Sequence, residues 1–86
     1  MSGDAGRSEL LAAVAEQLIA VRVRLGYDVE LAASLAHVDP ERLIEAEEAA
    51  TALTEEELQR VAEAYGVDVA AFFGGRVTPI SYLAGA

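Results

Sequence analysis

Helix start and stop signals recur at short intervals along this sequence, and they limit it to a bundle of short helices. Gly26 and Gly66 each follow an apolar periodic stretch, as is typical where a helix ends in a left-handed residue. Between them, Asp28, Asp39 and Thr54 each stand where a side-chain oxygen can cap the first turn of a new helix. The 86 residues have room for one domain around one small core.

Five helices are predicted, and the fold class is all-α. The first begins at Ser8 and carries apolar residues at three- and four-residue spacing until Gly26. Pro40 directly after Asp39 suits the first turn of the third helix, and Thr54 with Glu57 forms a capping box for the fourth. The helices are expected to cover residues 8–25, 29–36, 40–49, 55–65 and 69–73.

The two ends of the chain are predicted to differ from this helical domain, residues 8–75. Residues 1–7 are small and polar and are expected to form a disordered lead. Residues 76–86 are expected to form a short extended C-terminal arm, because Pro79 interrupts a segment rich in β-branched and aromatic residues. Four apolar side chains make it a possible dimer or partner arm, or a cover for its own core: Val77, Ile80, Tyr82 and Leu83.

Composition argues against several classes of function. The chain has no cysteine and one histidine, His37, with no second ligand at metal-binding spacing, so no metal site is expected. It also shows no nucleophile with an adjacent base and no glycine-rich phosphate loop, so no enzyme activity and no cofactor are expected. The apolar run at residues 10–15 is too short to span a membrane, and a cytoplasmic location is expected.

Between Leu18 and Phe73, the types and the spacing of several residues follow a recognisable pattern. It comprises Arg22, Gly26, Ala33, Ala36, Val38, Leu43, Glu47 and the segment "LQRVAEAYGVDVAAFF". In this pattern the chain resembles the Cro and lambda-repressor-like helix-turn-helix family, also called the Xre family. The resemblance implies a five-helix lambda-repressor-like bundle in which residues 40–49 form the recognition helix. It also implies a structural ion pair between Arg22 and Glu47.

The sequence departs from the family pattern at two glycine positions. His37 stands in the turn before the third helix, and histidine is among the less penalised residues at positive φ, so the turn is expected to survive. Ala49 stands where the family has glycine after the third helix. Because the residues around Ala49 are good helix formers, this helix is expected to run beyond its usual length.

The expected recognition helix is acidic. The resemblance implies that a binding face consists of Pro40, Glu41, Arg42 and Glu45, with Asp28 and Val29 at the start of the second helix. Residues 39–57 nevertheless hold eight carboxylates and only one basic residue, Arg42, in a chain of net charge -9. Such a face repels phosphate, although Arg42 could still contact guanine.

Two functional hypotheses follow, both regulatory. In the first, the domain keeps the fold but uses the acidic helix to contact a basic protein surface or a second copy of itself. In the second, it is a dimeric, sequence-specific DNA-binding transcriptional regulator, a repressor or an antitoxin-like protein. Alternatively, these glutamates have no binding role and simply form a solvated helix surface. This interpretation suits Glu55, Glu56 and Glu57, in the first turn of a helix, better than it suits Glu41 and Glu45.

Overall fold

The computed structural model describes the backbone of residues 2–73 and the side chains of residues 8–73. This range is all-α, as predicted, and contains no β-strand. It holds four α-helices and one 3-10 helix: α1 (Ser2–Leu25), α2 (Val29–Ala36), α3 (Pro40–Glu47), α4 (Glu55–Tyr65) and η1 (Val69–Phe73). The expected fifth α-helix is therefore wrong. Its five residues form the tighter 3-10 turn, the usual form for so short a segment.

Local hydrogen bonds start three of the helices where the sequence predicts. The Asp28 carboxylate accepts the N–H of Leu31 at 2.7 Å, and the Asp39 carboxylate accepts the N–H of Glu41 at 2.9 Å. At α4 the Thr54 hydroxyl accepts the N–H of Glu57 at 3.0 Å, and the Glu57 carboxylate accepts the N–H of Thr54 at 2.8 Å. These caps satisfy donors that have no partner inside the helix.

The N-terminal boundary of α1 differs from the expectation. The helix begins at Ser2, six residues before Ser8, so residues 2–7 continue α1 instead of forming the disordered lead. Extending an existing helix fixes one residue for each added hydrogen bond, whereas starting a helix is costly. Small polar residues can therefore continue a helix that the stripe after Ser8 has already established.

The C-terminal boundary of α3 also differs, because the helix ends at Glu47 and is not extended. Ala49 takes the left-handed conformation with φ 61°, and the N–H of Ala50 donates to the Glu45 carbonyl at 2.9 Å. Helix propensity is a weak preference that packing overrides. Here Ala52 and Leu53 are almost fully buried, which turns the chain back into the core.

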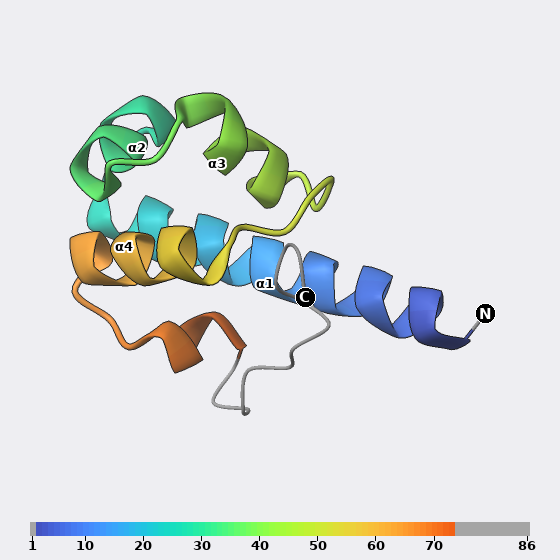
Figure 1. Cartoon of the computed structure of the whole chain (residues 1–86). Helices are drawn as coiled ribbons and strands as arrows, with labels where there is room; N and C mark the ends of the chain where they lie inside the picture. Colours follow the sequence, from blue (N-terminus) through green and yellow to red (C-terminus); the bar gives the residue numbers. More distant parts are fainter. Residues whose placement is uncertain (1, 74–86) are drawn as a thin grey trace.

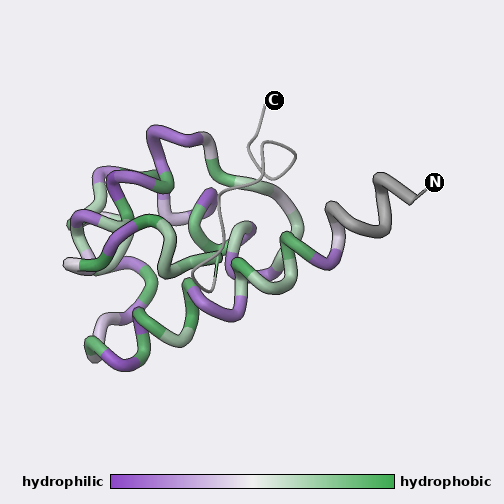
Figure 2. Tube along the Cα trace, turned by 90° about the horizontal axis from the view of Figure 1, so that it is seen from below, coloured by the Kyte–Doolittle hydropathy of each residue, from purple (hydrophilic) through white to green (hydrophobic). Residues whose placement is uncertain are grey.

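Every helix within residues 2–73 contributes side chains to the core. In Figure 1, α2 and α3 lie on one side of α1 and α4, and η1 lies on the other side. Along the coloured part of the tube in Figure 2, hydrophobic and hydrophilic segments alternate. The largest fully buried side chains come from α1, α3, α4, η1 and the loop before α4: Phe72, Leu18, Leu43, Leu53, Leu58, Val14 and Val61. The helix α2 contributes only alanines, which lets it pack closely against α4.

The apolar residues of the C-terminal arm, together with all of residues 74–86, lie outside the described residues. None of the helices within residues 2–73 combines the length and the apolar character that a membrane span needs.

Candidate functional site

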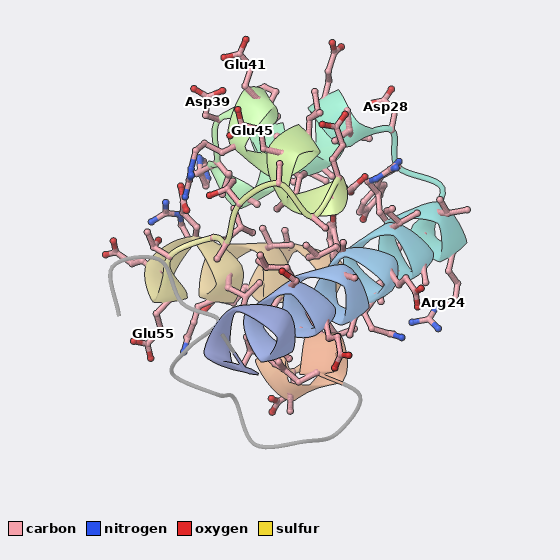
Figure 3. The ribbon with its side chains drawn as sticks, turned by 90° about the vertical axis from the view of Figure 1, so that its right-hand side faces the viewer. Arg24, Asp28, Asp39, Glu41, Glu45 and Glu55 are labelled. Atoms are coloured by element: carbon pink, nitrogen blue, oxygen red, sulfur yellow. The ribbon has the colours of Figure 1, made fainter. Side chains whose placement is uncertain are left out.

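The outward face of α3 carries three carboxylates around one aliphatic side chain. Glu41, Ile44, Glu45 and Glu48 follow the i, i+3, i+4, i+7 spacing that places residues on one face of a helix, and all four are exposed. Leu43 and Ala46, on the opposite face, are buried in the core. Figure 3 shows Asp39, Glu41 and Glu45 on the side of the molecule that α2 and α3 form, pointing away from the body.

Arg42 lies on the same helix, but its side chain does not contribute to the outward face. Its Nη2 donates to Glu57 Oε1 at 2.6 Å and its Nε donates to Glu57 Oε2 at 3.2 Å, so the two side chains form a bidentate ion pair. Nη2 also donates to the carbonyl of Ala52 at 3.3 Å. The hydrogen bonds from Arg42 are the main cause that lowers the pKa of Glu57, and the contact raises the pKa of Arg42 in turn. Arg42 therefore fastens α3 to the start of α4.

Arg22 and Glu47 form a second bridge of the same kind at the other end of α3. Arg22 Nε donates to Glu47 Oε2 at 2.7 Å, and Nη2 donates to Glu47 Oε1 at 3.0 Å. The side chains are 17% and 9% exposed, so this pair is more shielded from water than the Arg42 pair. Nη1 of Arg22 also donates to the carbonyl of Tyr27 at 2.9 Å, which fixes the turn between α1 and α2. The ion pair implied by the family resemblance is thus present in the structure.

The Arg42–Glu57 bridge removes the cation from the binding face that the resemblance implies. Arg42 is the only basic residue between Asp28 and Glu57, and its guanidinium is already occupied. Within residues 2–73, the carboxylates of Glu41, Glu45 and Glu48 have no ion pair or side-chain hydrogen bond. All the charged side chains on the outward face of α3 are therefore anionic, and Ile44 (37% exposed) adds apolar surface among them.

The remaining predicted residues lie around this face. Pro40 is exposed at the first turn of α3, and Asp28 is exposed and caps α2. Val29 is half-buried and packs against the core, so it contributes less surface than the resemblance implies. His37 takes the left-handed conformation at φ 58°, as expected for the turn before α3.

Three relevant residues were missed by reasoning from the sequence. Ile44 and Glu48 share the outward face, and continuing the helical spacing from Glu41 would have found them. Glu57 was interpreted only as part of the capping box and of the first turn of α4. Its bond to Arg42 joins residues 15 positions apart, and no local pattern marks that contact.

The described residues offer little else that resembles a reactive site. No group of three or more potential metal ligands occurs within residues 2–73. An open depression of about 490 Å³ at the start of α4 is lined by Thr54, Glu55, Glu56 and Gln59. Its acidic lining follows from the first turn of a helix, where the macrodipole favours carboxylates.

Comparison with known proteins gives no relative. No protein-family model matches the chain, and no curated protein and no solved structure is significantly similar to it. The resemblance to the lambda-repressor-like family therefore depends on the spaced residues of the sequence.

Proposed function

We propose that this chain is a regulatory helix-turn-helix protein of the Xre type that acts through protein contacts made by α3. Three features support the fold assignment. The helices α2 and α3 are joined by only three residues, 37–39. Arg22 binds Glu47, as the family pattern implies, and His37 and Ala49 are left-handed at the two positions where that pattern has glycine.

The engagement of Arg42 with Glu57 is the observation that carries the proposed mode of action. A protein that binds a duplex derives most of its affinity from lysine and arginine side chains that neutralise phosphates. The α3 face offers carboxylates instead, because its one guanidinium is bound within the chain. The same charges favour a partner surface that presents lysine or arginine, and they speed its encounter with α3.

The partner surface should combine basic and apolar side chains. Glu41 and Glu45 are one helical turn apart, and Glu48 extends the row, while Ile44 lies among them. A basic helix with an aliphatic residue between its arginines matches this arrangement, since the arginines can pair with carboxylates while the apolar groups leave water. A flat basic surface without an apolar residue would leave Ile44 uncovered.

The second candidate is the dimeric DNA-binding regulator. The arrangement of α2, the three-residue turn and α3 favours it, because a helix placed in this way can enter a major groove. It requires that Arg42 leave Glu57, or that basic residues outside α3 supply the phosphate contacts.

One titration separates the two candidates. The ¹⁵N-labelled full chain is titrated with a helical peptide carrying arginine at i, i+4 and i+7 around one leucine, and separately with a mixed-sequence DNA duplex. We expect the peptide to shift the backbone amide signals of residues 41–48, and the duplex to leave them unchanged at physiological salt. A scrambled peptide of the same charge should bind more weakly and without preference for α3.

Two results would contradict the proposal. Equal shifts at acidic residues over the whole surface would show that only net charge is recognised. Firm retention on heparin, together with duplex binding at physiological salt, would favour the DNA-binding regulator instead.

A further inference from the structure

The backbone on either side of α3 is strained in a way that the rest of the described chain avoids. Four residues between 2 and 73 have positive φ in the left-handed region: Gly26, His37, Ala49 and Gly66. The two glycines follow α1 and α4 and adopt this conformation without steric cost. The two residues that have a Cβ lie in the turns that flank α3, His37 three residues before it and Ala49 two residues after it, and there the left-handed backbone brings Cβ close to a carbonyl oxygen.

Few apolar contacts hold α3 in place against this strain. Only Leu43 and Ala46 of its eight residues are buried, whereas α4 buries four of its eleven. Its other attachments are the bidentate bridges from Glu47 to Arg22 of α1 and from Arg42 to Glu57 of α4. Segments with little apolar burial are the ones that open locally before a protein unfolds as a whole.

We propose that α3 opens as a separate unit, with His37 and Ala49 as its hinges, and that the two arginine–glutamate bridges set how often it opens. Opening lets both hinge residues leave the left-handed conformation, so the strain favours the open state. The bridges oppose it, because each fixes one end of α3 to a helix that stays in the bundle. The helix α3, which carries the acidic face, would thus exist in a closed state packed on the bundle and an open state detached from it.

Native-state hydrogen exchange of the full chain, measured by NMR in increasing sub-denaturing urea, tests this proposal. In the unaltered protein we expect the amides of residues 44–48 to exchange at least tenfold faster than the buried-face amides of α1 and α4. Their exchange should also depend less on urea, because a local opening exposes less surface than global unfolding. The same rate and the same urea dependence in all three helices would overturn the proposal.

Two variants and two controls test one hinge and one bridge. Ala49→Gly removes the strain at one hinge and should slow the exchange of α3 about fivefold. Glu57→Gln weakens one bridge and should speed that exchange by a similar factor, whereas Glu55→Gln, which removes an equal charge from a residue without a bridge, should leave it unchanged. Phe72→Leu disturbs the packing of η1 and should speed exchange in α1 and α4 without changing α3. If Phe72→Leu speeds the exchange of the α3 amides as much as that of the α1 and α4 amides, then α3 opens only when the whole protein unfolds, and the proposal is wrong. The test needs no binding partner, so its result is independent of the proposed function.

Discussion

Arg42 binds the same carboxylate that caps α4, because Glu57 accepts hydrogen bonds from both the Arg42 guanidinium and the Thr54 N–H. One glutamate thus joins the first turn of α3 to the first turn of α4. It also neutralises the only cation that the outward side of α3 could have offered to a ligand. The Arg42–Glu57 bridge therefore affects both the stability of the fold and the charge on the outward face of α3.

The stabilising effect of the Arg42 bridge can be measured without removing the cap. In Glu57→Gln, the glutamine oxygen can still accept the Thr54 N–H, because glutamine also serves in a capping box. We expect the variant to lose about 1 kcal/mol of unfolding free energy, since a partly exposed bidentate pair lies at the upper end of surface ion pairs. Urea unfolding checks this value. Glu55→Gln, in the same turn, should change the free energy by less than about 0.5 kcal/mol.

The same bridge makes part of the stability dependent on pH. Arg42 lowers the pKa of Glu57 in the folded state below its ordinary value of 4.5, so the unfolded chain binds the proton first as the pH falls. This stabilisation is complete above the ordinary pKa and is lost as the pH falls through the lower folded-state pKa. The difference in unfolding free energy between the wild type and Glu57→Gln should therefore shrink below about pH 4.5. A difference that stays constant down to pH 2.5 would contradict the assigned direction of the shift.

The Arg22 bridge is more shielded, and breaking it should cost more. Arg22→Gln also removes the donor to the Tyr27 carbonyl and leaves Glu47 without its partner, so we expect a loss of about 2 kcal/mol, between the values for exposed and fully buried pairs. Glu47→Gln should destabilise as well. The double variant Arg22→Met, Glu47→Leu should be less destabilised than the sum of Arg22→Met and Glu47→Leu made singly, because no charge is left unpaired. Additive losses in a double-mutant cycle would show that the two residues act independently.

Relief of backbone strain after α3 should stabilise the protein. Ala49→Gly should raise the unfolding free energy by about 1 kcal/mol, since glycine adopts φ 61° without the steric cost that Ala49 carries. For a domain of this size, the gain corresponds to an increase of roughly 4–8 °C in Tm. His37→Gly should gain less, because histidine is less penalised at positive φ. Ala50→Gly serves as the control: without positive φ to relieve, it should leave Tm unchanged or lower it.

The acidic face can be converted to test whether charge alone keeps α3 away from DNA. Glu41→Lys with Glu45→Lys should produce weak duplex binding with a steep salt dependence, because each phosphate contact adds roughly 0.9 to the slope of log affinity against log salt. Glu41→Gln with Glu45→Gln should give weaker binding and a smaller slope. Fluorescence anisotropy against labelled duplex measures both.

A matched variant controls for net charge in this experiment. Glu16 and Glu63 are exposed on α1 and α4, away from the outward face of α3. Glu16→Lys with Glu63→Lys changes the net charge by the same amount. Equal duplex affinity in the two lysine variants would mean that the position of α3 has no special role.

The sequence by itself determined where most helices begin and end. Asp28, Asp39 and Thr54 cap their helices through hydrogen bonds to residues two or three positions away, and Gly26 and Gly66 end helices by adopting a conformation open to few other residues. These interactions are local, so the residue types and their spacing are sufficient to predict them. The family resemblance likewise placed Glu41 and Glu45 on the outward face of α3, and both are exposed there.

Tertiary structure decided what the local signals could not. Ala49 ends α3 although its neighbours favour a helix, because burial of Ala52 and Leu53 turns the chain inward. Arg42, expected at a binding face, pairs instead with a glutamate 15 residues away, since the packing of α3 against the start of α4 brings the two side chains together. Strain and long-range pairing depend on how distant segments meet, and that geometry is fixed only when the whole core forms.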